Sequence, residues 1–271
     1  MLTLYFSGTG NTKFIAELFS SKMGAVCFSI EEPRNFTSLL KAHDTVCFCY
    51  PIYGSRVPRI LREFVARHMS DINGKKIVIL VTQVLFSGDG ARVFTDMFWD
   101  GAIDVIYAEH FLMPSNVCNL PLLWQTSQRK TQRYIARAKV KMHRVCQNIK
   151  SGTVVKRGFT VFSQVLGNIQ GRLWQGSSKE IYPARFSAEN MAMAGVKIHK
   201  QCHKCGKCIS ACPVKNFENT RGAITHKSSC IVCYRCVNLC PKRAITVMMF
   251  HRRPRRQYTA MIKAHNEPNK N

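Results

Sequence analysis

The sequence predicts an α/β protein in which a doubly wound, five-stranded parallel sheet precedes a small α+β domain. Two observations carry this prediction. Short apolar segments alternate with amphipathic helical segments through the first 150 residues, as in parallel sheets with crossover helices. Eight of the 13 cysteines then fall between residues 202 and 240, in two copies of one spacing. At 271 residues the chain is long enough for two domains.

The first strand is expected at Leu2–Phe6, and it ends in a loop of small and hydroxyl-bearing residues. The loop consists of Ser7, Gly8, Thr9, Gly10, Asn11 and Thr12. A strand, such a loop and a helix in this order direct backbone N–H groups at a phosphate. No Walker lysine or Gly-x-Gly-x-x-Gly pattern follows, which argues against a nucleoside triphosphate or NAD. The alternative is a solvated turn that caps the helix.

The other elements of the sheet follow in order. We expect strands at Ala25–Ile30, Thr45–Tyr50, Lys76–Thr82 and Ile103–Tyr107, and helices at Pro58–His68, Gly90–Trp99 and Gln125–Lys150. Ligands of parallel sheets lie at the carboxyl ends of the strands, so the loops at 7–12, 50–58 and 83–90 share the predicted binding edge. Asp89, between two glycines, is interpreted as a helix N-cap.

The cysteine spacing Cys-x2-Cys-x2-Cys-x3-Cys-Pro occurs twice, 28 residues apart. In this pattern three cysteines hold one [4Fe-4S] cluster and the fourth holds the cluster of the other copy. One predicted ligand set is Cys202, Cys205, Cys208 and Cys240, and the other is Cys230, Cys233, Cys236 and Cys212. Zinc sites and disulfide frameworks are the alternatives. Zinc needs only two Cys-x2-Cys pairs, and disulfide frameworks belong to secreted domains. His199 and His203 are not expected to be ligands.

Two resemblances follow from these motifs. Residues 1–150 resemble flavodoxins through the loop at residues 7–12, and about 194–250 resemble bacterial two-cluster ferredoxins through the cysteines. The first implies FMN, with flavin loops at Tyr50–Gly54 and Val84–Gly90. The implied FMN-binding residues are Ser7, Gly8, Thr9, Gly10, Asn11, Thr12, Pro51, Tyr53, Gly54, Phe86, Ser87 and Gly88.

Within those loops, Tyr53 is expected to cover the flavin ring, and Phe86 to act as a second lid. The alternative is that both aromatic side chains only pack the loops. Ordinary flavodoxins keep acidic residues near the ring, whereas here Arg56 and Arg59 follow the second loop. This departure suggests an anionic reduced flavin or an anionic substrate.

The net charge of +25 lies almost wholly in the second part of the chain. Residues 1–109 hold 11 basic and 11 acidic side chains, whereas residues 110–271 hold 29 and 4. A surface of one sign on this scale predicts an acidic partner, an anionic membrane or nucleic acid. We expect acidic redox proteins, with peripheral contact to an anionic membrane as an alternative, and no base-specific nucleic-acid binding.

The segment Val154–Trp174 carries an apolar stripe at helical spacing and basic flanks. The stripe consists of Val155, Phe159, Phe162, Leu166, Ile169 and Leu173. We expect a helix packed between the two domains; the alternative is an interfacial helix on an anionic membrane. The expected domains are 1–150 (FMN-binding), 151–193 (basic amphipathic linker), 194–250 (clusters, repeats at 194–222 and 223–250) and 251–271 (basic, disordered tail).

No apolar window approaches a membrane span, the first residues lack the features of a signal peptide, and thiolate clusters need a reducing compartment. We therefore expect a cytoplasmic protein. The whole chain resembles the flavodoxin–ferredoxin fusion proteins of anaerobic bacteria. This implies electron transfer between two [4Fe-4S] clusters and FMN for a redox partner. Two alternatives remain: an FMN-dependent oxidoreductase with its own small substrate, and a basic interaction protein with structural clusters. No catalytic residue is assigned.

Overall fold

The larger part of the protein is a six-stranded parallel sheet in the order β2-β1-β3-β4-β5-β6. The computed structural model describes residues 1–85, 88–119, 127–248 and 251–258. The strands are β1 (Leu2–Tyr5), β2 (Val26–Ser29), β3 (Thr45–Pro51), β4 (Lys76–Gln83), β5 (Asp104–Leu112) and β6 (Val155–Lys156). The doubly wound parallel sheet is confirmed. The short β6 adds a sixth strand, paired with β5, from a segment that we expected to be helical.

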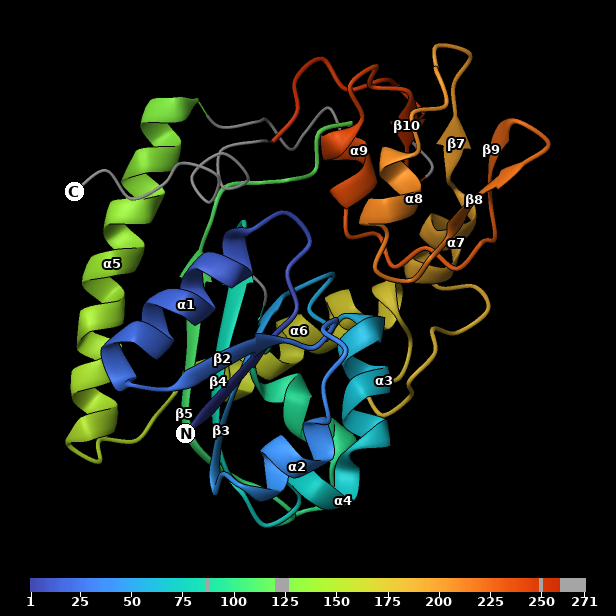
Figure 1. The fold of residues 1–271 in the computed structure, drawn as a ribbon. Helices are drawn as coiled ribbons and strands as arrows, with labels where there is room; N and C mark the ends of the chain where they lie inside the picture. Colours follow the sequence, from blue (N-terminus) through green and yellow to red (C-terminus); the bar gives the residue numbers. More distant parts are fainter. Residues whose placement is uncertain (86–87, 120–126, 249–250, 259–271) are drawn as a thin grey trace.

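Helices cover both faces of this sheet (Figure 1). The helices α1 (Asn11–Met23) and α5 (Gln128–Lys150) lie on one face, where they bury Cys47, Cys49 and neighbouring residues. The other face packs against α2 (Phe36–Lys41), α3 (Arg59–Arg67), α4 (Met69–Ile72) and the 3-10 helix η1 (Arg92–Met97). Alternate residues of β1 therefore enter different cores, which explains why the strands are apolar throughout. The helix expected at Gly90–Trp99 is only this short 3-10 segment.

The second unit is small and built from two similar halves. It contains β7 (Lys197–Ile198), α8 (Lys207–Ala211), β8 (Phe217–Thr220), β9 (Ala223–His226), α9 (Arg235–Leu239) and β10 (Ile245–Thr246). The backbone repeats with the sequence period of 28: residues 204 and 232, 206 and 234, and 215 and 243 all have φ between 49° and 73°. The first two pairs let each cysteine loop curl tightly before its short helix, and residues 215 and 243 turn the chain after it.

The segment between the two units is fastened by buried Arg62 of α3. Its guanidinium donates to the carbonyl oxygen of Ile181 (2.7 Å) and to Gln175 Oε1 (3.0 Å). It also forms an ion pair at 3.0 Å with Glu189 of α7 (Ala188–Ala194). Both partners of that pair are at most 5% exposed, so removal of either one would leave a buried charge without its partner.

The units also contact each other directly. Ile231 and Cys233, from the second cysteine loop, pack within the apolar core on the α3 side of the sheet. The tail returns to the first unit as well: Tyr258 is 5% exposed and packs with the residues between α1, α5 and the sheet. The expectation of a disordered tail is therefore wrong for Gln257 and Tyr258, and residues 259–271 lie outside the described part. Among the described residues, no helix combines the length and apolarity needed to cross a membrane.

Candidate functional site

A cavity of about 290 Å³ lies at the carboxyl ends of the sheet strands. The loops after β1, β3, β4 and β5 form most of its wall. The remaining wall comes from the helix α6 (Val161–Trp174) and from the second unit, through Gln170, Trp174, Val232, Tyr234 and Met248. The cavity therefore lies at the predicted binding edge and also at the junction of the two units.

The loop after β1 presents an open helix N-terminus to this cavity. Gly10 is the N-cap of α1, has a φ of 100° and provides no side-chain cap. Its N–H donates to Ser7 Oγ at 3.1 Å, which holds the loop in a tight turn. Thr12 Oγ1 lies 2.8 Å from Thr82 Oγ1, and Asn11 Nδ2 donates to the Pro114 carbonyl at 2.8 Å. This geometry suits a phosphate, because backbone N–H groups of the first helical turn lack intrahelical acceptors.

Most of the predicted FMN-binding residues lie on the cavity wall. These are Ser7, Gly8, Thr9, Asn11, Thr12, Pro51, Tyr53 and Gly54. Gly10 instead shapes the loop behind the wall. Gly88 is not on the wall: a Cβ atom added to it would lie 2.6 Å from the backbone of Gly167 in α6. Phe86 and Ser87 lie outside the described residues.

Two aromatic residues meet the cavity from different parts of the chain. Tyr53 lies on the wall as expected, and its hydroxyl is buried without a hydrogen-bond partner among the described residues. Burial, with a smaller effect of Cys233, raises the pKa of Tyr53 well above its ordinary value, so the hydroxyl stays neutral. A neutral donor without a partner at the wall fits a polar ligand such as FMN.

Trp174 is the second aromatic residue, and the sequence did not reveal its role. A Cβ atom added to Gly54 would lie 2.3 Å from Trp174 Cγ, so the indole lies directly on the Gly54 backbone. Only glycine permits this approach, and its φ of 54° also favours glycine. Trp174 is 120 positions away from Gly54 in sequence, and no local pattern links the two.

Arg56 and Arg59 do not line this cavity. Arg56 is 2% exposed, and its guanidinium contacts the carbonyl oxygens of Ser55 and Gly167 at 3.3 and 3.4 Å. Arg59 is 7% exposed; it donates to the Ser229 carbonyl at 2.6 Å and pairs with Glu63. Burial lowers the pKa of Arg56. Both arginines fasten other segments of the chain, so neither is placed to attract an anionic substrate to the cavity.

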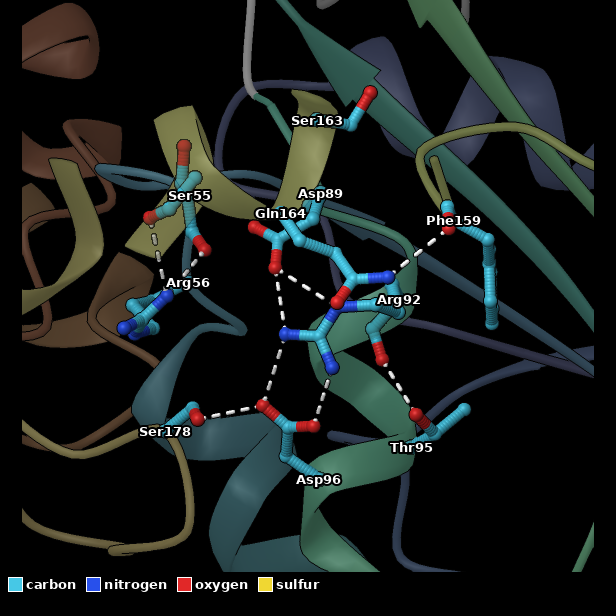
Figure 2. Close-up of polar contacts among 12 residues, drawn as sticks. Ser55, Arg56, Asp89, Arg92, Thr95, Asp96, Phe159, Ser163, Gln164 and Ser178 are labelled. Atoms are coloured by element: carbon cyan, nitrogen blue, oxygen red, sulfur yellow. Dashed lines mark hydrogen bonds and ion pairs between the residues drawn. The ribbon is translucent and has the colours of Figure 1, made fainter. Parts of the chain in front are cut away.

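Asp89 is not a helix N-cap; it forms a buried ion pair (Figure 2). Arg92 donates to Asp89 Oδ2 through Nε (2.9 Å) and Nη2 (2.6 Å), and to Asp96 Oδ1 through Nη1 (2.6 Å). Ser178 donates to Asp96 Oδ2 at 2.5 Å. Burial raises the pKa of Asp89, and Arg92 opposes this shift. The cluster ties η1 to the segment that follows α6, which is a structural role.

The structure brings one of the two predicted cysteine sets together around a single cavity. Four cysteines line one small cavity at the start of α9: Cys212, Cys230, Cys233 and Cys236. Cys208, Cys202 and Cys205 form a neighbouring group, in which burial raises the pKa of the Cys208 thiol to about 11. Cys240 lies buried at the end of α9. Among the described residues no three metal-binding side chains are close enough to hold a single ion; a cubane binds its four thiolates through four different irons.

Backbone N–H groups point at three of the sulfurs. The Asn216 N–H donates to Cys212 Sγ at 3.3 Å, and the Ala244 N–H donates to Cys240 Sγ at 3.2 Å. These two contacts are equivalent in the two copies. The Val232 N–H donates to Cys230 Sγ at 3.3 Å. N–H donors stabilise thiolates and raise the reduction potential of a cluster that they ligate.

Arg235 joins the cysteine loop to the phosphate-type loop. Its guanidinium donates to the carbonyl oxygens of Ser7 (2.7 Å) and Gly8 (3.1 Å). It also forms a bidentate contact with Glu31, at 2.8 Å for each oxygen. Cys233 lies two positions before this arginine, so one of the predicted cluster ligands is held beside the cofactor cavity.

Family models match both units of the chain. The model described as "Flavodoxin domain" matches residues 2–115, and the model described as "4Fe-4S dicluster domain" matches residues 194–241. The chain is a flavodoxin–ferredoxin fusion. The first domain of the fusion implies FMN, and the second implies iron–sulfur chemistry and electron transfer. Comparison with curated protein sequences finds no match.

Solved structures align with the flavodoxin part of the fusion. Two-electron reduced flavodoxin from Megasphaera elsdenii is 16% identical with a TM-score of 0.36, covering 52% of this chain and 99% of that one. Oxidised Flavodoxin 2 from Bacillus cereus is 15% identical, with a TM-score of 0.33 and coverages of 52% and 97%. General stress protein 14 from Treponema denticola, in complex with FMN, is 12% identical, with a TM-score of 0.38 and coverages of 54% and 96%.

Proposed function

We propose that the protein carries one FMN and two [4Fe-4S] clusters and passes electrons between them on behalf of a redox partner. The observation that supports this most directly is the shared cavity wall. Val232 and Tyr234, on either side of the predicted ligand Cys233, line the same cavity as the loop Ser7–Thr12. Electron transfer needs short distances between centres, and a cluster held by Cys233 would lie close to a flavin bound in this cavity.

The chain's own groups would hold the FMN as follows. Backbone N–H groups at the start of α1 and the hydroxyls of Ser7, Thr9 and Thr12 would bind the phosphate. The flavin ring would lie against Tyr53 and Trp174, which exclude water from it. When bound, FMN accepts either one or two electrons, whereas each cluster accepts one.

The two clusters would occupy different positions along this route. The set of Cys230, Cys233, Cys236 and Cys212 lies next to the cavity. The set of Cys202, Cys205, Cys208 and Cys240 would form the outer end, where Cys205 is exposed. The exposed lysines beside it, Lys200, Lys204 and Lys207, give that end a positive charge that fits an acidic redox protein.

The cavity supports electron transfer better than turnover of a separate substrate. Its wall holds no Lys, Arg, His, Asp or Glu among the described residues, so it offers no charged acid or base. Arg56 and Arg59, which had suggested an anionic substrate, lie elsewhere. Asn11, Gln83, Asn116 and Gln170 are the amide side chains of the wall, and they suit hydrogen bonds to a flavin.

Anaerobic purification with cofactor analysis tests the proposal. We expect about eight iron atoms, about eight sulfides and one FMN per chain. Zinc in place of iron, or protein that cannot be loaded with FMN, would contradict it. A redox titration followed by visible and EPR spectra would then give the order of the three centres.

Partner docking is tested by stopped-flow reduction with a small acidic ferredoxin. The rate constant should fall by about tenfold or more as ionic strength rises from about 0.01 M to about 1 M. The double variant Lys204→Gln/Lys207→Gln should lower the low-salt rate. The matched variant Lys130→Gln/Lys139→Gln, on α5, should not. A larger effect of the α5 variant would move the docking site away from the outer cluster.

A further inference from the structure

The helix α6 turns its apolar side away from the protein. Six large apolar residues of this helix are between 37% and 76% exposed: Val161, Phe162, Val165, Leu166, Ile169 and Leu173. The residues that it buries are Gly167 and Gly171. The apolar stripe predicted from the sequence does exist over residues 161–174, but the expectation that it packs inward is wrong. We call these six residues the outer face of α6.

Helical geometry places the two sets on opposite sides. Successive residues are rotated by about 100°, so the outer face spans an arc of about 140° and the glycines lie roughly opposite its centre. Arg172 is the one polar residue within that arc. A protein–protein interface usually forms about one hydrogen bond per 100–200 Å² of buried surface. The outer face of α6 has almost no side-chain group that could form one.

The orientation of α6 is fixed by contacts that only glycine allows. A Cβ atom at Gly167 would lie 1.8 Å from Asp89 Oδ1, and one at Gly171 would lie 1.9 Å from Arg56 Nη1. The Asp89 and Arg56 side chains are fully or almost fully buried. Rotating the helix to bury its apolar side would press leucine and phenylalanine against these charged groups, at a high desolvation cost.

Positive charge borders the outer face at both ends. Lys156 and Arg157 precede the helix, and Arg172 and Lys179 lie in or after its last turn; all four are exposed, and Arg157 also pairs with Glu109 at 2.6 Å. No acidic residue occurs from His110 to Lys179. The following segment adds Tyr182 and Phe186, which are 64% and 87% exposed. Apolar side chains bordered by basic residues fit a membrane surface, where hydrocarbon chains lie beneath anionic lipid headgroups.

We propose that the outer face of α6 binds the surface of an anionic lipid membrane, with its apolar side chains in the acyl boundary. A second copy of the chain is a poorer occupant, because it would bring the same positive border into contact with itself. A protein partner would find few hydrogen-bonding groups there. Gln170 and Trp174 of the same helix line the cofactor cavity, so this binding would hold the cavity about one helix diameter, roughly 10 Å, from the lipid.

Vesicle flotation of the full holoprotein tests this proposal. The protein should float with vesicles of phosphatidylcholine and phosphatidylglycerol, and much less with phosphatidylcholine alone. The variant Phe162→Ser/Leu173→Ser should lower the partition coefficient of the protein onto these vesicles by about tenfold or more, because two large apolar side chains no longer enter the lipid. The control Val140→Ser removes a side chain that is 75% exposed on α5 and should change nothing.

Three outcomes would overturn the proposal. The first is that the wild-type protein does not float with anionic vesicles. The second is that Phe162→Ser/Leu173→Ser floats as well as the wild type, because binding would then depend on charge alone. The third is a wild-type dimer in sedimentation velocity that this variant converts to a monomer, which would assign the outer face to a second copy. Unchanged FMN and iron contents would establish that the variant is folded.

Discussion

Gly8 of the flavodoxin domain and Cys233 of the ferredoxin domain meet without room for a side chain between them. A Cβ atom at Gly8 would lie 2.5 Å from the Cys233 carbonyl oxygen and 3.3 Å from the Tyr53 hydroxyl. The phosphate-type loop and the cysteine loop are thus in backbone contact, and several predictions depend on how closely they are held.

The substitution Gly8→Ala tests that contact. The φ of Gly8 is not in the left-handed region, so alanine fits its backbone and only the contact is perturbed. Overpacking costs about 1–3 kcal/mol, and we expect the dissociation constant of FMN to rise by about tenfold, measured by flavin fluorescence on the apoprotein. Ser21→Ala, at an exposed position of α1, serves as the control. Unchanged affinity and an unchanged rate of FMN reduction would show that the loops separate readily.

Arg235→Gln should loosen the two domains from each other. It removes charge-assisted hydrogen bonds to Glu31 and to the Ser7 and Gly8 carbonyls, each worth about 1.5–3 kcal/mol where it is buried. We expect faster limited proteolysis between residues 176 and 194 and a higher dissociation constant for FMN. The control Arg34→Gln breaks the exposed ion pair with Glu32. It should lower the free energy of unfolding by less than about 1 kcal/mol. Identical proteolysis rates for the two variants would contradict the prediction.

Trp174 should report FMN binding through its fluorescence. An indole at the cavity wall is quenched by a bound flavin, so titrating FMN into the apoprotein should lower the tryptophan emission. Trp174→Phe should remove most of this quenching but retain affinity, whereas Trp174→Ala should lose about tenfold in affinity because an aromatic contact disappears. Trp99→Phe, at a residue that is 86% exposed, should leave the quenching intact. Full quenching in Trp174→Phe would place the flavin elsewhere.

Gly171→Ala should destabilise the protein although alanine favours helices. Helix propensity alone predicts a gain of about 1 kcal/mol. The clash with the buried Arg56 guanidinium should outweigh it and lower the free energy of unfolding by about 1–3 kcal/mol in urea titrations. Asn168→Ala, three residues earlier in α6, should be neutral or slightly stabilising. A stabilised Gly171→Ala protein would mean that α6 is not held against Arg56.

The ligand sets can be separated by removing one cysteine at a time. Cys212 belongs to the first repeat in sequence but lines the cavity of Cys230, Cys233 and Cys236. Cys212→Ala should therefore disturb the cluster beside FMN, with iron falling towards about four atoms per chain and FMN reduction slowing. Cys202→Ala should disturb the outer cluster and leave photochemical reduction of FMN intact. The reverse pattern in EPR spectra would exchange the two assignments.

Local sequence patterns predicted the elements that depend on local physics. The strands are apolar throughout because both faces are covered, and the phosphate-type loop and cysteine loops are short motifs whose chemistry fixes their spacing. The helix expected at Gln125–Lys150 is present as α5, and it buries Ala138, Met142 and Val145 at helical spacing. Lys141 of that helix, which had no acidic neighbour in sequence, pairs with Glu109 of β5 at 2.9 Å.

The errors share one physical cause. A periodicity of 3.6 identifies an apolar face but does not say what that face contacts, so the stripe of α6 was assigned to the wrong side. Gly167 and Gly171 lower the helix propensity of α6, yet they mark the side that touches the protein. Trp174, Arg56 and Tyr258 likewise depend on contacts between distant segments, which a single sequence does not display.

The cavity wall drawn from both domains has a consequence for maturation of the protein. The flavodoxin domain emerges first during synthesis, with its phosphate-type loop complete but its cavity still open on one side. The ferredoxin domain closes that side only when Ile231 and Cys233 enter the core and Arg235 reaches Ser7 and Gly8. Until the ferredoxin domain has folded onto the flavodoxin domain, the cavity therefore lacks the part of its wall that Val232, Tyr234 and Met248 supply.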